Sequence, residues 1–217
     1  MGQGGFKQQK KGDHFVKGIF LEGISAKEQA QILKTQQEAY DTFVENLPEE
    51  EQQYLCLPEI VSYISAKTGK IKTILLAPYM NQRDLWGANQ SIPKQQWPKI
   101  LLQIAKGVKA MHDCEFAHLD IKEDNVLVNE ENGVFTAKLT DFDLMQNVED
   151  EEEPRASMQE DIRALGEVFY HVSWQNPVAE EHKELFNALT ELMRGDDPNT
   201  RPTIDQLIPF LERMQAE

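Results

Sequence analysis

Residues 118–144 constrain the fold and chemistry of this chain more than any other segment. They begin with a His-x-Asp-x-Lys-x-x-Asn pattern, and an Asp-Phe-Asp triplet starts sixteen residues after the Asn. Phosphoryl transfer requires a carboxylate near the attacking hydroxyl, a cation over the γ-phosphate and oxygen ligands that hold Mg²⁺ across the phosphates. The residues that supply this set are Asp120, Lys122, Asn125 and Asp141.

The same segment has a plainer interpretation as a β-hairpin with a polar loop. Asp and Asn would then act as turn formers around Glu131-Asn132-Gly133. A turn explains any one of the polar residues, but it does not explain four residue types at these spacings. They are interleaved with the apolar residues Ile121, Val126, Leu127, Val128 and Leu139. We therefore favour the phosphoryl-transfer interpretation.

Composition restricts the class of protein and of partner. The 217 residues are 40% hydrophobic, enough for one sizeable core or two small packed lobes. A net charge of −15 argues against nucleic acid or an anionic membrane as the main partner and suits a basic protein better. Cys56 and Cys114 lack disulfide or zinc spacing. With neither a membrane span nor a signal peptide in the sequence, we expect a soluble, cytoplasmic monomer.

The 118–144 segment resembles the catalytic and metal-binding loops of eukaryotic-like protein kinases. Two further segments carry the same resemblance: Asp161–Gly166 is similar to the start of the family's central helix, and residues 196–203 to the loop that holds a structural Arg, here Arg201. Thr203, at the end of that loop, and Gln206 predict a capping box for a last helix. The resemblance implies an α+β, bilobal kinase-like fold. Its reduced, β-rich N-lobe would span residues 1–80 and its mainly helical C-lobe residues 81–217.

The resemblance also implies roles for the residues of the segment, with ATP and Mg²⁺ as cofactors. Asp120 would orient the substrate hydroxyl or accept its proton, and Lys122 would neutralise the γ-phosphate. Asn125 and Asp141 would hold Mg²⁺. Leu127 would form an apolar floor beneath the adenine. His118 would support the loop backbone, and Asp161 would anchor it.

The first eighty residues carry the other half of the implied nucleotide site. Gly2, Gly4 and Gly5 form a candidate phosphate-binding turn before two strands, and Lys17 would hold the α- and β-phosphates. A glycine-rich frayed end is the alternative. A helix is predicted from Ala26 to Leu47, and its Glu38 would pair with Lys17. Two alternatives stay open: Gln36 holds that position through a weaker hydrogen bond, or Glu38 is simply solvated.

Further elements follow from periodicity and turn signals. Residues 61–64 and 71–76 predict a hairpin that runs into Ala77–Met80, and residues 96–112 predict an amphipathic helix. By resemblance, the Met80 backbone would face adenine and Asp84 would lie near the ribose. An ordinary strand exit is the alternative.

Several departures from the family pattern bear on regulation. About twenty residues join Asp141 to Asp161, too few for a full activation segment, and the segment's Ala-Pro-Glu motif is absent. Leu119 replaces an Arg, and Asp143 replaces a Gly. We therefore expect no activation by loop phosphorylation and expect substrates to be recognised through another surface or a partner protein. Arg201 would take a carboxylate partner from residues 149–153, unless that acidic run is a solvated loop.

The sequence thus predicts a Ser/Thr protein kinase that transfers the ATP γ-phosphate to a protein. It is similar to the compact kinase effectors that bacterial pathogens secrete, which would place it in a host cytosol with host proteins as substrates. One alternative is a pseudokinase that binds nucleotide or a partner without turnover, favoured by Phe15, Gln36 and Asp143. Another is a small-molecule phosphotransferase of the aminoglycoside type, which Lys122 and the Arg201 loop oppose.

Overall fold

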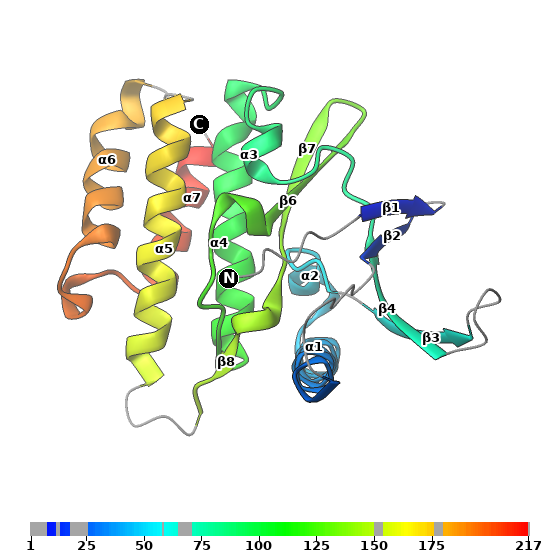
Figure 1. The fold of residues 1–217 in the computed structure, drawn as a ribbon. Helices are drawn as coiled ribbons and strands as arrows, with labels where there is room; N and C mark the ends of the chain where they lie inside the picture. Colours follow the sequence, from blue (N-terminus) through cyan, green and yellow to red (C-terminus); the bar gives the residue numbers. More distant parts are fainter. Residues whose placement is uncertain are drawn as a thin grey trace.

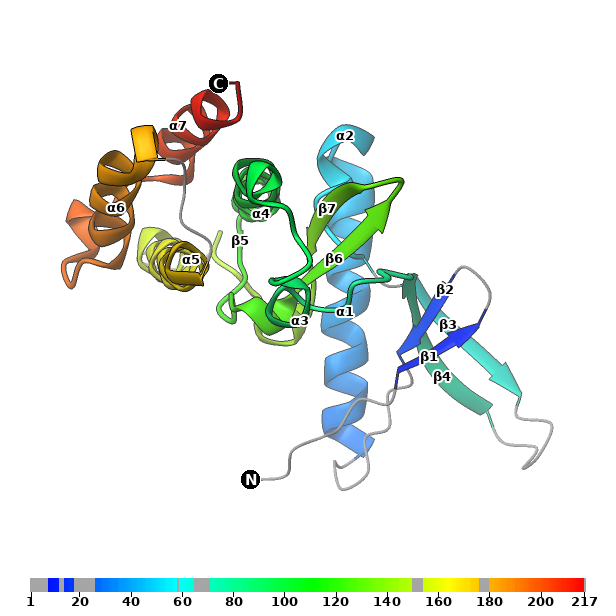
Figure 2. The ribbon, with the colours of Figure 1, turned by 90° about the horizontal axis from the view of Figure 1, so that it is seen from above.

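The computed structural model describes residues 8–11, 14–17, 26–57, 59–64, 71–149, 154–175 and 180–216. Within them, a four-stranded sheet lies at one side of the molecule and the helices α4–α7 at the other (Figure 1). The long helix α1 and the β6–β7 hairpin lie between these two parts, as the view from above also shows (Figure 2). Helices and antiparallel sheets are both present, as an α+β fold requires.

The sheet contains β1 (Gln8–Lys11), β2 (His14–Lys17), β3 (Glu59–Ile64) and β4 (Ile71–Pro78) in the order β1-β2-β4-β3. All neighbouring strands are antiparallel. The two predicted early strands and the predicted hairpin are therefore confirmed. Lys17 ends a central strand, where it lies opposite Leu75 of β4.

Helix α1 (Ala26–Asn46) confirms the helix predicted before Pro48, and a single helical turn, α2 (Glu49–Gln52), follows it. The inner face of α1 reaches the molecule's core through Phe43, whose side chain is fully buried. Leu47, just beyond the end of α1, is also buried. Burial of these apolar side chains attaches the helix to the rest of the fold.

The predicted amphipathic helix is α4 (Trp97–Asp113), with Pro98 in its first turn, where the missing N–H leaves no hydrogen bond unmade. It follows α3 (Leu85–Ala88) and the 3₁₀ turn η1 (Lys94–Gln96). One face of α4 approaches its neighbours very closely at Gly107. A Cβ atom there would lie 3.0 Å from the Tyr54 carbonyl oxygen and 3.3 Å from the Leu139 Cβ.

After α4 the chain forms two small sheets that carry the predicted site segment. β5 (Phe116–Ala117) pairs with β8 (Gln146–Asn147), and β6 (Val126–Glu131) pairs with β7 (Val134–Leu139). Asn132 and Gly133 connect the hairpin with φ values of 52° and 80°, which suit an Asn-Gly turn. The hairpin is thus real, and the remaining polar residues lie outside its turn.

Three helices complete the fold: α5 (Pro154–Gln175), α6 (Glu180–Arg194) and α7 (Ile204–Ala216), with the 3₁₀ turn η4 (Pro198–Thr200) before the last. Helix α5 begins seven residues before Asp161, so the predicted start was too late. Pro154 is tolerated there because the first turn needs no backbone donor. One of the two hydrogen bonds of the predicted capping box is confirmed, since the Thr203 N–H donates to Gln206 Oε1 at 2.9 Å.

Arg201 pairs with a different carboxylate from the one expected. Its side chain is buried and its Nη1 donates to Glu160 Oε1 at 2.8 Å and to the Gln159 carbonyl at 2.9 Å, while Nε donates to the Gly195 carbonyl at 2.8 Å. The carboxylate that Arg201 contacts among the described residues is therefore Glu160 of α5; of the expected partners in 149–153, residues 150–153 lie outside the described residues. In the described part of the chain, no helix combines the length and the apolar character needed to cross a bilayer.

Candidate active site

One carboxylate fixes the backbone of the candidate catalytic loop, residues 118–125. Asp161, fully buried on α5, accepts hydrogen bonds from the backbone N–H groups of His118 at 2.7 Å and Leu119 at 2.8 Å. His112 Nε2 lies 3.0 Å from the same carboxylate. Leu119 adopts a left-handed conformation with φ of 61°, which is strained for a branched side chain. The Asp161 contacts hold this strained turn in place, as the sequence predicted.

His118 supports the loop from inside. Its buried ring accepts from the Asp120 N–H at Nδ1, at 3.3 Å, so Nε2 is the protonated nitrogen that donates to the Thr140 carbonyl at 3.0 Å. Burial lowers the pKa of His118, and Asp161 opposes this effect only in part. The ring is therefore a neutral structural link between the loop and the Thr140 segment.

Three of the predicted site residues meet at one carboxylate. Lys122 Nζ and Asn125 Nδ2 both donate to Asp120 Oδ2, and Asn125 Nδ2 also donates to the Asp120 backbone carbonyl at 2.8 Å. A 3₁₀ turn, η2 (Glu123–Asn125), sets this geometry by bringing the Asn125 N–H to the Lys122 carbonyl at 3.0 Å. Asp120 thus presents a partly exposed carboxylate beside an exposed ammonium group.

Asp141 is brought to the same region by a backbone bond. The Thr140 N–H donates to the Asn125 carbonyl at 2.9 Å, which fixes the start of the Asp141 segment against η2. Asp141 itself is left-handed (φ 69°, ψ 71°) and precedes the 3₁₀ turn η3 (Phe142–Leu144). Backbone strain of this kind gathers at functional sites.

Aromatic contacts connect this strained segment to α1. The buried Phe142 ring lies 5.9 Å from the Phe43 ring and 5.6 Å from the His118 ring, centroid to centroid. Phe43 also makes an edge contact with Phe116 at 5.8 Å. These contacts pack α1 against both candidate loops.

The predicted adenine-side residues lie on adjoining segments. Asp84 bridges to Leu127 of β6, and its Oδ1 caps α3 by accepting the Gly87 N–H at 2.7 Å. Met80 is buried just before this point, and Leu127 is half buried. The contacts of these three residues with adenine and ribose stay predictions.

The phosphate-side assignments are only partly described. Gly2, Gly4 and Gly5 lie outside the described residues, as does the side chain of Lys17. Glu38 is exposed and pairs with Lys34 on its own helix at 3.1 Å. At 3.6 residues per turn, Glu38 lies about 140° around α1 from Phe43.

Position 36, in contrast, lies within about 20° of Phe43 around the axis of α1. The inward face of the helix therefore favours Gln36 over Glu38 as the residue that faces the site. The side chain of Gln36 lies outside the described part of the chain, so this assignment stays a prediction.

The oxygen ligands present suit a nucleotide-bound magnesium ion. With its Nδ2 directed at Asp120, Asn125 offers a cation its Oδ1, and Asp141 offers a carboxylate. No described group of three or more His, Cys, Asp or Glu side chains is arranged to hold a metal. Mg²⁺ keeps few protein ligands and completes its octahedron with phosphate oxygens and water, so this donor set fits a metal that arrives with a nucleotide.

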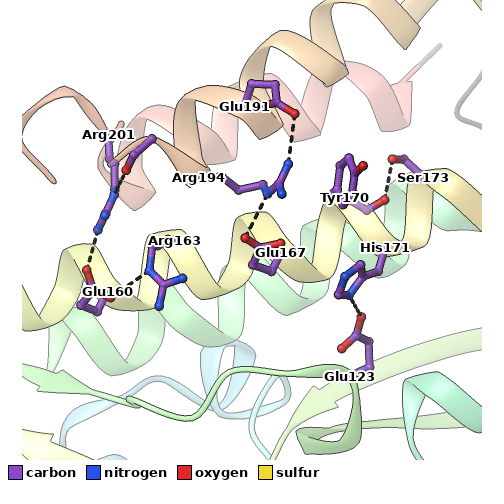
Figure 3. Close-up of polar contacts among 11 residues, drawn as sticks. Glu123, Glu160, Arg163, Glu167, Tyr170, His171, Ser173, Glu191, Arg194 and Arg201 are labelled. Atoms are coloured by element: carbon purple, nitrogen blue, oxygen red, sulfur yellow. Dashed lines mark hydrogen bonds and ion pairs between the residues drawn. The ribbon is translucent and has the colours of Figure 1, made fainter. Parts of the chain in front are cut away.

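Two contributors to the site went unpredicted. His112 contacts the Asp161 carboxylate from α4, and His171 Nδ1 of α5 lies 2.7 Å from Glu123 Oε1 in η2 (Figure 3). Each histidine lies far in sequence from its partner. Helical periodicity marks buried apolar faces, and it carries no signal for such pairs.

Comparison with known proteins gives a consistent result. A family model described as "Protein kinase domain" matches residues 31–162. The membrane-associated tyrosine- and threonine-specific cdc2-inhibitory kinase of Drosophila melanogaster is 45% identical over 60 residues, 28% of this chain and 11% of that protein. Wee1-like protein kinase 2-B of Xenopus laevis is 30% identical over 146 residues, 64% of this chain and 24% of that protein.

A third relative, serine/threonine-protein kinase DCLK3 of Mus musculus, is 31% identical over 101 residues, 44% of this chain and 13% of that protein. The chain therefore spans less than a quarter of the length of each of these relatives. The family match covers more than half of the chain, including both candidate loops. The chain belongs to the protein kinase family.

Proposed function

We propose that this chain is an ATP-dependent protein kinase that phosphorylates Ser or Thr residues of a protein. The observation that carries the proposal is the shared environment of the Asp120 carboxylate. It lies beside the Lys122 ammonium group and the Asn125 amide, on a loop whose backbone Asp161 holds. Family membership supports kinase chemistry at this place.

Each residue has a distinct part in this proposal. Asp120 accepts a hydrogen bond from the substrate hydroxyl and orients the hydroxyl oxygen toward the γ-phosphate. Lys122, released from Asp120, moves to the γ-phosphate and balances its charge. Asn125 Oδ1 and Asp141 hold Mg²⁺, which neutralises the phosphate charge that builds up during transfer. Lys17 holds the α- and β-phosphates.

The nucleotide in this proposal lies between two lobes. In it, residues 1–80 form the small lobe and residues 81–217 the large lobe. The adenine lies against Met80 and Leu127, and the ribose lies against Asp84. The link of Asp84 to Leu127 supports this placement because it joins the first residues of the large lobe to the strand that follows the catalytic loop.

The proposed substrate is a protein whose acceptor is Ser or Thr, because Lys122 follows the pattern of Ser/Thr kinases. The names of the relatives include tyrosine/threonine and serine/threonine specificity, so the acceptor residue requires direct measurement. The short connection from Asp141 to α5 favours recognition through another surface or an activating partner. Because of this short connection, the proposal includes a role as a secreted effector that acts in a host cytosol.

A phosphotransfer assay tests the proposal. Wild-type protein is incubated with Mg²⁺, radioactive ATP and eukaryotic lysate, and phosphosites are mapped by mass spectrometry. Asp120→Asn is expected to lower the rate by about 10²- to 10⁴-fold. Asp205→Asn, on the exposed first turn of α7, is the matched control and should leave the rate unchanged. Absence of transfer by wild type, with and without lysate, refutes the proposal.

Nucleotide binding without turnover is the second candidate. It is favoured by the exposure of Glu38 and its pairing with Lys34, which leave the predicted Lys17 partner facing away from Phe43. A protein of this kind would show an ATP-dependent rise in melting temperature and no phosphate transfer. The two measurements on the same sample separate the candidates.

A further inference from the structure

Helix α5 reaches the catalytic loop at a second point besides Asp161. His171 Nδ1 and Glu123 Oε1 are 2.7 Å apart, and Figure 3 shows the two side chains pointing toward each other from α5 and the loop. Since a carboxylate only accepts, the histidine ring donates this hydrogen bond. Glu123 belongs to η2, the single turn that begins directly after Lys122 and ends at Asn125.

The two contacts of α5 hold opposite ends of the loop. Asp161 and His171 are ten residues apart, which corresponds to about 15 Å along a helix. Asp161 binds the loop where it begins, at the N–H groups of His118 and Leu119. His171 binds it where it ends, at Glu123. Asp120 and Lys122 lie between the two anchors.

The Glu123 contact differs from an ordinary surface ion pair. The side chain of Glu123 is 17% exposed, whereas both partners of the nearby Arg163–Glu160 pair on α5 are exposed by 45% and 48%. Solvent screens the charge of a partly buried carboxylate less, so the loss of its hydrogen-bond donor costs more free energy. His171 contributes the exposed half of the pair, at 51%.

We propose that His171 is a positioning residue for phosphoryl transfer, acting through Glu123 to hold the η2 turn. The inference rests on the proposed kinase function. When His171 is absent, η2 keeps its bond from Thr140 to the Asn125 carbonyl and loses its tie to α5. The orientation of Lys122 and Asp120 then becomes less uniform, while the predicted ATP contacts of Lys17, Met80 and Leu127 stay as they are.

Steady-state kinetics tests the proposal on the full chain. His171→Ala is expected to lower kcat by about three- to tenfold, the range of a single hydrogen bond, and to change the KM for ATP by less than about twofold. His171→Gln keeps a donor of similar reach and should recover most of the loss. Arg163→Ala removes an ion pair of the same helix that does not touch the loop, so it should match wild type.

A double-mutant cycle shows whether Glu123 transmits the effect. Glu123→Gln combined with His171→Ala should be no slower than the slower single variant, because both changes break one contact. Hydrogen exchange of backbone amides in residues 118–127 should become faster in His171→Ala and stay at the wild-type rate in Arg163→Ala. The proposal is overturned if the kcat losses of the two changes are additive. It is also overturned if His171→Gln has no higher kcat than His171→Ala, or if amide hydrogen exchange in His171→Ala equals that of wild type.

The proposed function and this inference fail in different ways. Wild-type protein that transfers no phosphate refutes the kinase function and, with it, a positioning role in transfer. Active wild-type protein with a His171→Ala variant equal to Arg163→Ala in kcat and in exchange refutes the positioning role alone.

Discussion

Replacing Asp161 with Asn tests whether this one side chain organises the candidate catalytic loop. The carboxylate is fully buried and accepts from two backbone N–H groups, those of His118 and Leu119, as well as contacting His112. An Asn amide of the same shape offers one oxygen and places an NH₂ group against the other N–H. One hydrogen bond to a charged acceptor is therefore lost and a buried donor is left unpaired.

The expected loss of stability follows from these contacts. A hydrogen bond to a charged group contributes about 1.5–3 kcal/mol, and the remaining neutral bond is weaker, so Asp161→Asn should lose about 2–4 kcal/mol. For a chain of this size each kcal/mol lowers Tm by about 2–4 °C, which predicts a fall of about 4–16 °C. Because Leu119 is held in a strained conformation by the same contact, kcat should fall as well.

Calorimetry and the phosphotransfer assay measure the two effects on one preparation. Asp205→Asn is the matched control because Asp205 is exposed, at 70%, and pairs with the partly exposed Lys109 at 2.7 Å. An exposed pair contributes at most about 1 kcal/mol, so this control should lie within a few degrees of wild type. An Asp161→Asn variant that has the same Tm as the control and the same kcat as wild type would refute the anchoring role.

Three further predictions concern packing, pH and metal. Gly166→Ala should destabilise the protein by about 1–3 kcal/mol in urea titration, because the new Cβ would lie 2.8 Å from the Met193 Cβ; an unchanged midpoint would contradict the tight α5–α6 packing. Hydrogen bonds from Arg201, and then from Arg163, lower the pKa of Glu160, so its contribution to stability is complete above the usual pKa of 4.5 and is lost as pH falls through the lowered value. Glu160→Gln should therefore be less stable than wild type at neutral pH, with a difference that shrinks at acid pH; a constant difference would show that the charge is not responsible. Asn125→Ala should raise the Mg²⁺ concentration needed for half-maximal phosphate transfer, measured by metal titration. An unchanged Mg²⁺ concentration would show that Asn125 is not a metal ligand.

Local patterns in the sequence predicted most of the elements. Apolar periodicity and Pro48 located α1, the Asn132-Gly133 turn located the β6–β7 hairpin, and Thr203 with Gln206 located the start of α7. Each of these signals depends on residues a few positions apart, so local sequence is sufficient to read it.

Long-range polar pairs were not predictable in the same way. The sequence indicated that Arg201 needs a carboxylate, but it offered several; in the structure Glu160, in the part of α5 that precedes Asp161, takes this role. The pairing of His171 with Glu123 depends on how α5 crosses the loop. Such contacts are decided by tertiary packing, which a pattern along one element does not contain.

Backbone and side-chain hydrogen bonds fasten residues 81–83 to β6. The Gln82 N–H donates to the Val128 carbonyl at 3.1 Å, the Val128 N–H donates to the Arg83 carbonyl at 2.7 Å, and the Asn81 side chain bonds to the backbone of Glu130. This segment is therefore part of the same rigid body as β6, which continues directly from Asn125. We therefore expect any rotation of the sheet relative to the helices to take place on the β4 side of Asn81 and to leave the catalytic loop in place.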